Sequence, residues 1–542
     1  MSTTPTHSLP PAPSGTLRTD SLVGSVVLLL GLTVLQRLVG FVRAVLFCRW
    51  LDADQLGQWD MAFGFLCLAA PIAVLAVPGA FGRYVERYRQ RGQLRVFIRR
   101  TAVFCASLVT LAVALVVAAR GWFSDLVFGT SEHLDLVLLV ALSLAVLAGY
   151  NFTIELFTAL RNVRAVSLMQ MLHSVTFAAL GIGLLVGWQS SAAGVLIAYG
   201  ASCLIAMGVA VCWLAGAWRR SPQVDEPVAG RDLWGKMMPF AGWVLLSSFL
   251  ANSFQIADRY MIVHYSGMAP DEALGRVGAY HSSRVVPLLL VSIAIMLGTM
   301  ATPHFSHDWE AGRRERVGTR LRLFVKLVGF GLCAAAVVVL AVAPLLFNVG
   351  FQGKFADGLA VLPWTLCYCL WFGLFMVLEN YLWCAEKARL AGLALGIGLA
   401  VNVGLNLLLL PLLGLLGAVL ATTAANFVVL ALICWFNYRL GFRLDLGTRV
   451  VLALPLAVCL GPGLSAAVLL VVALMALHGE RLLSAEEKRQ IAEGVREYWE
   501  RAQRVPRLGP MVAALLRAAG GLARRDVCRD GPNANAAGKP AR

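Results

Sequence analysis

Long apolar segments separated by short polar ones make up most of the chain. Each has roughly the 20 residues that a helix needs to cross the hydrocarbon core of a membrane. Twelve such segments are predicted, six in each half: 22–48, 59–82, 101–119, 134–158, 165–186, 192–215, 237–263, 277–302, 321–347, 359–382, 390–410 and 417–437. A last apolar block, 450–477, is interrupted by Gly461, Pro462 and Gly463, so we expect a thin two-helix hairpin and about fourteen spans in all.

The two halves of the chain carry matching landmarks. Gly57 and Gly278 each stand 26 residues before a basic position that follows the second span of their half. Gly194 and Gly417 each lie at the start of a sixth span. Repeats of this kind build transporters with two lobes around one site. The sequence therefore predicts an all-α polytopic membrane protein with two six-helix lobes of the same topology and an appended C-terminal hairpin.

The same pattern gives a domain plan. After the hairpin, the spacing of Ser484 and Glu487 is typical of a capping box, and Ile491, Val495, Tyr498, Trp499 and Ala502 form an apolar stripe. The expected segments are a disordered cytoplasmic tail (1–20), an N-lobe (21–220), a cytoplasmic linker (221–236), a C-lobe (237–440), the hairpin (450–478), cytoplasmic amphipathic helices (483–525) and a disordered tail (526–542).

Basic residues are concentrated on one side of the predicted spans. With a cytoplasmic N-terminus, the connections on the cytoplasmic side contain runs such as 83–100 and 313–326, which are rich in arginine. The opposite connections hold only Arg49, Arg120, Arg276 and Lys354. Positive charge marks the cytoplasmic side of membrane proteins, so both termini are expected to be cytoplasmic.

Composition excludes several classes of function. The chain is 59% hydrophobic and 14% charged, with a mean hydropathy of +0.74, which places it in a bilayer. Its net charge of +16 follows the cytoplasmic loops, so no nucleic-acid partner is expected. Most of the cysteines lie in apolar runs without CxxC pairs, and neither a phosphate-binding GxxxxGK[ST] loop nor an HExxH motif occurs. We expect no metal, no ATP hydrolysis and no catalytic residue.

Polar residues inside two consecutive spans indicate a water-filled site. Ser248, Asn252, Gln255 and Arg259 follow at intervals of four, three and four residues, which places them on one helical face. The next span brings in another group, which consists of Tyr280, His281 and Arg284. An arginine at membrane depth costs several kcal/mol unless it faces a cavity or a partner.

The first span also contains an arginine near its middle, Arg37. Three arginines on three spans favour a cavity that binds an anion. The candidate substrate-binding residues are Arg37, Arg259, Arg284, Asn252, Gln255 and Tyr280. Candidate sites for coupling to Na⁺ or H⁺ are Asp258, Glu155 and Glu379, although the two glutamates also fit an interfacial role and Asp258 could simply neutralise Arg259. Three asparagines are interpreted as side chains that form hydrogen bonds between helices: Asn402, Asn406 and Asn426.

Several of these motifs resemble a known superfamily. The run from Gln36 to Arg43 followed by Gly57, and the run from Tyr280 to Pro287, resemble the first and eighth spans of the lipid II flippases. Three other segments are similar to O-antigen and exopolysaccharide flippases: Asp258-Arg259, Val277–Tyr280, and Asn402 to Ala418. Both groups belong to the multidrug/oligosaccharidyl-lipid/polysaccharide (MOP) exporter superfamily, and the resemblance covers about residues 20–480.

The resemblance implies two lobes in a V around a cationic cavity, lined by Arg37 and Arg284. The expected function is a flippase of the bacterial cytoplasmic membrane, without a cofactor, that moves a polyprenyl-diphosphate-linked oligosaccharide by alternating access. Its partners would be that lipid-linked glycan, the bilayer and polysaccharide assembly proteins, and we expect a monomer. A drug/cation antiporter and a glycan polymerase or ligase are the alternatives. The arginines would bind the common diphosphate, whereas Asn252 and Gln255 would select the sugar.

Overall fold

The computed structural model describes residues 22–218 and 230–503. The predicted disordered tails and much of the predicted linker lie outside this part of the chain. The chain forms two compact units, residues 1–469 and 470–542, and all features of the candidate site belong to the first. The described residues are overwhelmingly helical and contain no strand.

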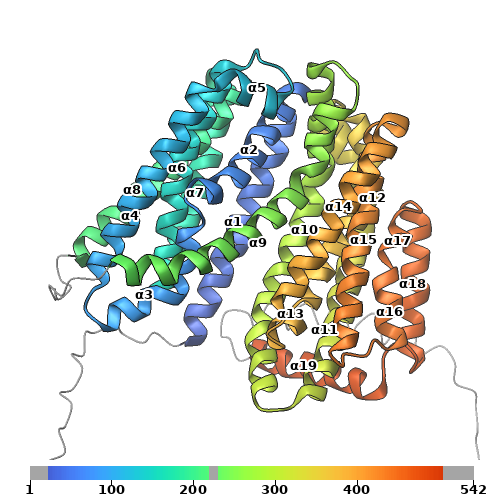
Figure 1. Ribbon diagram of the computed structural model, residues 1–542. Helices are drawn as coiled ribbons and strands as arrows, with labels where there is room; N and C mark the ends of the chain where they lie inside the picture. Colours follow the sequence, from blue (N-terminus) through green and yellow to red (C-terminus); the bar gives the residue numbers. More distant parts are fainter. Residues whose placement is uncertain (1–21, 219–229, 504–542) are drawn as a thin grey trace, which may run out of the picture. The chain divides into compact units, whose positions relative to one another are not determined.

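The first half of the chain forms the N-terminal helix group (Figure 1). Its elements are α1 (Leu22–Trp50), α2 (Ala53–Ala73), the short 3-10 helix η1 (Val77–Ala80), α3 (Phe81–Gln90), α4 (Leu94–Ala118), α5 (Arg120–Phe128), α6 (Leu134–Ala159), α7 (Val163–Gly187) and α8 (Ala192–Trp218).

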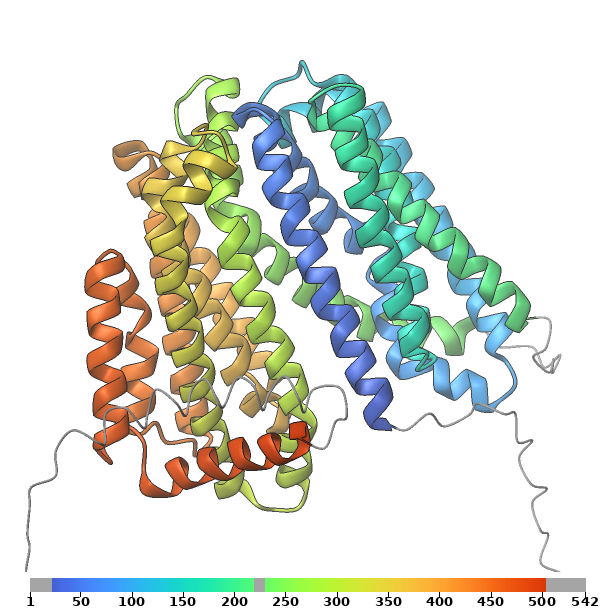
Figure 2. The same cartoon turned by 180° about the vertical axis from the view of Figure 1, so that it is seen from behind.

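The second half forms the C-terminal helix group (Figure 2). Its elements are α9 (Gly230–Tyr265), α10 (Pro270–Glu310), α11 (Arg314–Leu345) with a π-helical turn (Leu346–Gly350), α12 (Ala356–Leu378), α13 (Asn380–Cys384), α14 (Ala388–Leu413) and α15 (Leu415–Arg439). The twelve predicted spans correspond to the twelve helices of the described residues that are long and apolar enough to cross a membrane, so the predicted fold class is confirmed.

The terminal apolar block forms helices, as predicted. These are α16 (Leu446–Ala453), α17 (Pro455–Val458) and α18 (Pro462–His478), and the chain turns at Gly461, whose φ of +88° favours glycine. The helical segments on either side of the turn are shorter than the twelve spans. Whether they cross the membrane stays a prediction. In the second unit, α19 (Ala485–Gln503) begins with the predicted capping box: Glu487 Oε2 accepts from the Ser484 N–H at 2.9 Å, and Ser484 Oγ accepts from the Glu487 N–H at 3.2 Å.

The second predicted span does not continue to residue 82. Helix α2 ends at Ala73, and Leu75 and Ala76 both take a left-handed φ of 49° before η1 begins. Pro78 contributes to the break, because it has no N–H to donate to the carbonyl four residues earlier. The chain then enters α3, an amphipathic helix that buries Tyr84 and Tyr88.

Helix α9 connects the two helix groups. It begins at Gly230, inside the predicted linker, because Leu233 and Met237 are buried in the N-terminal group against α3 and α4. The Tyr84 hydroxyl donates to the Lys236 carbonyl at 2.8 Å. The later part of α9 packs against α14, where Phe254 contacts the helix surface at Gly398. Figures 1 and 2 show α9 running from one group to the other, which brings the predicted polar stripe beside α2 and α10.

Candidate functional site: a charged cavity beside a buried ion-pair cluster

A cavity of about 270 Å³ lies among helices of both groups. Helix α1 contributes Arg37, and α9, α10, α12 and α15 contribute the rest of the wall. The polar lining residues are Arg37, Gln255, Asp258, Arg284, Ser292, Tyr368, Thr422 and Asn426. Phe254, Leu288, Val291 and Ile295 are among the apolar residues that complete the wall. A concave wall that combines apolar surface with converging polar groups is typical of ligand sites.

Two arginines of the cavity have free hydrogen-bonding capacity. Arg37 is exposed, and no described residue hydrogen-bonds or ion-pairs with it. Arg284 is largely buried, and its Nη1 has no hydrogen-bond partner among the described residues. Its guanidinium lies over the Tyr280 ring, 5.3 Å from the ring centre. Both side chains can therefore donate to an anion in the cavity.

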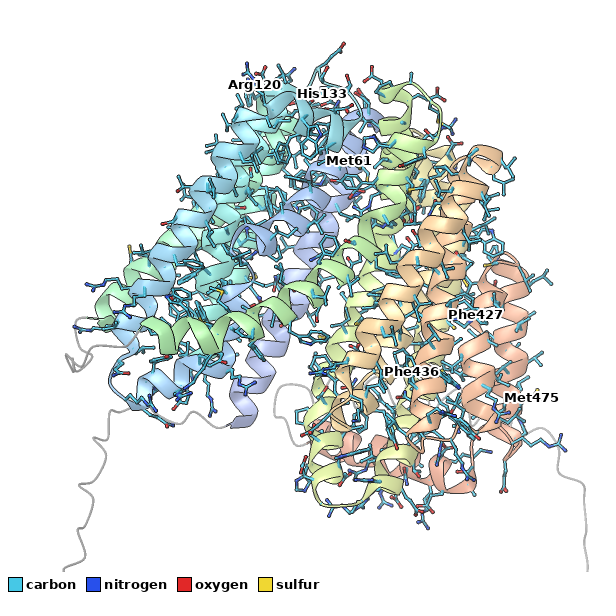
Figure 3. The ribbon with its side chains drawn as sticks, viewed as in Figure 1. Met61, Arg120, His133, Phe427, Phe436 and Met475 are labelled. Atoms are coloured by element: carbon cyan, nitrogen blue, oxygen red, sulfur yellow. The ribbon has the colours of Figure 1, made fainter. Side chains whose placement is uncertain are left out.

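Asp60 on α2 is the centre of a buried ion-pair cluster that the sequence analysis did not identify. Arg259 Nη1 lies 3.1 Å and His281 Nδ1 2.8 Å from Asp60 Oδ1, and Arg284 Nη1 lies 3.6 Å from Asp60 Oδ2. Asp60 is 3% exposed, and Met61, the next residue, is also buried (Figure 3). A carboxylate from the N-terminal group thus faces basic side chains from α9 and α10.

Arg259 does not face water, contrary to the sequence prediction. The residue is 4% exposed; Asp60 binds one end of its guanidinium, and the Gln255 carbonyl accepts from Nη2 at 2.5 Å. Arg259 is absent from the cavity wall. The signal that could have predicted this was Asp60 itself, because an acidic residue inside an apolar span needs a partner.

Asp258 forms a second polar cluster next to the cavity. Its Oδ2 accepts from the Tyr280 hydroxyl at 2.5 Å and from the Thr422 hydroxyl at 3.3 Å. Asn402 donates to Thr422 Oγ1 at 3.0 Å, which confirms the predicted role of this asparagine between helices. Tyr280 is fully buried, bonds to Tyr368 and is not part of the cavity wall, so the structure does not place this candidate substrate-binding residue in the cavity.

The other predicted site residues divide into two sets. Gln255 lines the cavity with Arg37, Asp258 and Arg284. Asn252 lies outside the wall, and its amide donates to the Ser248 carbonyl one turn earlier at 2.9 Å. Glu155 is exposed and Glu379 is half-buried, and neither belongs to the cavity wall. The described residues contain no group of three or more His, Cys, Asp or Glu side chains placed to hold a metal ion.

The two landmark glycines lie together at one end of α2 and α10. A Cβ atom on Gly57 would lie 1.9 Å from the Leu274 carbonyl oxygen, and one on Gly278 would lie 1.9 Å from the Ala53 carbonyl oxygen. Arg120 and His133 are labelled at the same end in Figure 3. From this crossing, the chain of α10 leads through His281 and Arg284 to Leu288 and Ile295 of the cavity. The glycine crossing thus precedes the cavity-lining residues along α10.

Comparisons with known proteins agree with this fold. The structure is similar to the lipid II flippase MurJ in an inward closed conformation, with a TM-score of 0.59 at 13% identity, covering 88% of this chain and 98% of that one. An inward-facing multidrug resistance transporter of the MATE family is similar with a TM-score of 0.55 at 13% identity, covering 77% of this chain and 95% of that one. A point mutant of the Vibrio cholerae MATE transporter VcmN is similar with a TM-score of 0.52 at 15% identity, covering 76% of this chain and 95% of that one. No curated protein sequence matches.

The chain thus has a fold that is also found in polytopic membrane transporters of the MOP superfamily. A family model described as "polysaccharide biosynthesis protein" matches residues 22–308, so the chain belongs to that family.

Proposed function

We propose that the protein is a flippase that translocates a polyprenyl-diphosphate-linked oligosaccharide by alternating access. The observation that carries this proposal is the pair Arg37 and Arg284, which line one cavity from the two helix groups with free donor groups. Arginine binds phosphate oxygens bidentately and stays charged at membrane depth, so two of them suit a diphosphate. The polysaccharide family and the likeness to a lipid II flippase support the same substrate class.

The direction of transport follows from the charge bias of the connections. The arginine-rich side is cytoplasmic by that bias, so the lipid-linked glycan would enter from the inner leaflet and leave at the end where Gly57 and Gly278 meet. In this orientation, the cavity wall between Arg284 and Ile295 would lie on the cytoplasmic side of this crossing. The chain would work in the bacterial cytoplasmic membrane, with polysaccharide assembly proteins as candidate partners.

Coupling to an ion is assigned to Asp258 in this proposal. Asp258 is the one candidate carboxylate in the described cavity wall, and the hydroxyls of Tyr280 and Thr422 both donate to it, while the Tyr368 hydroxyl bonds that of Tyr280. Oxygen donors around a carboxylate suit Na⁺ or a proton. Glu155 and Glu379 remain predicted candidates, outside this wall.

Charge reversal at Arg284 tests the proposal in cells. Arg284→Glu should abolish export of the surface polysaccharide at unchanged protein level, because the cavity then repels phosphate. Arg91→Glu is the matched control, because Arg91 is exposed and outside the cavity wall. Normal export by the Arg284→Glu variant would contradict the proposal. Resistance to cationic dyes, without any effect on polysaccharide, would instead support the drug antiporter.

A further inference from the structure

Asp60 links the two helix groups through charge. It projects from α2, and its three basic neighbours come from α9 and α10. The link lies one turn from the glycine crossing, because Asp60 follows Gly57 by three residues and His281 follows Gly278 by three. The ion-pair cluster and the glycine crossing therefore hold the same end of the two helices together.

The cluster is incompletely satisfied where it meets the cavity. Asp60 Oδ2, Arg259 Nε and Arg284 Nη1 have no hydrogen-bond partner among the described residues. The 3.6 Å separation of Arg284 Nη1 and Asp60 Oδ2 is too long for a hydrogen bond. Buried polar atoms without partners are costly, so a better acceptor for Arg284 would be favoured.

The two carboxylates near the cavity offset part of its positive charge. Asp60 and Asp258 both lie within ion-pair distance of Arg259, and Asp60 also faces His281 and Arg284. A phosphate that enters the cavity therefore competes with Asp60 for Arg284, which belongs to both the cluster and the cavity wall.

We propose that Asp60 is a displaceable internal anion. It holds the α2 and α10 ends together until a phosphate group of the substrate binds the Arg284 guanidinium in its place. This inference rests on the proposed function, because it requires an anionic substrate in the cavity. Phosphate binding weakens the contact between Asp60 and Arg284 and thus favours separation at Gly57 and Gly278. A ligand shifts such an equilibrium only by its differential affinity for the two states, and Arg284 provides that difference. Substrate would thereby trigger opening of the end through which it leaves.

Two measurements on the purified full chain test this inference, with inorganic pyrophosphate as the probe. Hydrogen exchange in the wild-type protein should become faster in 51–60 and 270–282 when pyrophosphate is added. Asp60→Asn should speed exchange there without pyrophosphate and should bind pyrophosphate about tenfold more tightly, a typical coupling between sites. Asp60→Glu keeps the charge and should resemble the wild type. The wild-type exchange measurement decides the question even if Asp60→Asn fails to fold.

A double-variant cycle separates this inference from the proposed function. The gain in affinity from Asp60→Asn should disappear in an Arg284→Gln background, because the competition is for that guanidinium. A gain that persists there, or exchange rates unaffected by bound pyrophosphate, would overturn the inference. If Arg284→Gln weakens pyrophosphate binding but Asp60→Asn changes nothing, the inference fails and the proposed function stands. Pyrophosphate that fails to bind the wild type at all would count against both.

Discussion

Gly57 and Gly278 each lie against the backbone of the other's helix, at distances that leave no room for a side chain. The Cβ atom of an alanine at either position would meet a carbonyl oxygen at 1.9 Å. The two glycines also hold matching positions in the two halves of the sequence. The crossing of α2 and α10 is therefore a contact between equivalent points of the two helix groups.

Substitution of either glycine by alanine should separate α2 from α10. We expect Gly57→Ala and Gly278→Ala each to destabilise the described conformation by about 1–3 kcal/mol, the usual cost of forcing extra volume into a packed region. Thermal unfolding of the purified protein measures this. Gly331→Ala is the control, because a Cβ atom there meets nothing within 4 Å. Equal unfolding temperatures for the Gly57 and Gly331 variants would show that the crossing is not tightly packed.

The two polar residues of the predicted stripe should behave differently. Gln255→Ala should change which lipid-linked glycan is transported, because Gln255 lines the cavity. Asn252→Ala should leave the preference unchanged, because its amide is bonded to its own helix. Translocation of several lipid-linked glycans in proteoliposomes compares the two variants. If Asn252→Ala alters the preference and Gln255→Ala does not, the assignment of the cavity wall to sugar selection is wrong.

The carboxylate that couples transport to an ion gradient can be identified by three amide substitutions. We expect Asp258→Asn to abolish the stimulation of transport by a Na⁺ or H⁺ gradient, because the charge next to Tyr280 and Thr422 is removed. Glu155→Gln and Glu379→Gln should keep that stimulation. Transport rates with and without each gradient provide the readout. Loss of stimulation in either glutamate variant, with the Asp258 variant still coupled, would move the coupling site away from the cavity.

The terminal hairpin is attached to the bundle by a buried lysine. Lys326 Nζ on α11 lies 2.5 Å from Asp445 Oδ2, just before α16. Burial raises the pKa of Asp445, and hydrogen bonds from Lys326 and Thr448 outweigh it, so the pKa lies below the ordinary value. The carboxylate therefore contributes stability above about pH 4 that is lost as the pH falls through its lowered pKa.

Asp445→Asn should lower the unfolding free energy at pH 7 by about 1–3 kcal/mol, less than for a fully buried pair because Asp445 is partly exposed. The difference from the wild type should shrink below about pH 4. Unfolding temperatures of the two proteins across this pH range measure the effect. Asp357→Asn, at an exposed carboxylate, is the comparison. A difference that does not depend on pH would mean that the carboxylate charge of Asp445 is not what stabilises the attachment.

Much of the helix pattern could be predicted because the membrane imposes it. Apolar length alone gives the twelve spans, and intramembrane arginines such as Arg37 and Arg284 are conspicuous in an apolar run. The burial of Arg259 could not be predicted from its own helix, because its partner Asp60 is 199 residues away. The end of α2 at Ala73 lies within an apolar run that is long enough to continue, so hydrophobic length alone does not predict it. Which residues of a polar stripe face the cavity depends on helix packing, as Asn252 and Gln255 illustrate.

The most direct measurement of the central claim is translocation of a polyprenyl-diphosphate-linked glycan in proteoliposomes that contain only this protein. Wild-type protein and the Arg91→Ala control should transport it, whereas Arg37→Ala and Arg284→Ala should reduce transport of every glycan offered. Binding of pyrophosphate should weaken in parallel, because the lost contacts are to phosphate. Full transport by both cavity variants, or transport lost for only some glycans, would contradict a cavity that holds its substrate by the diphosphate.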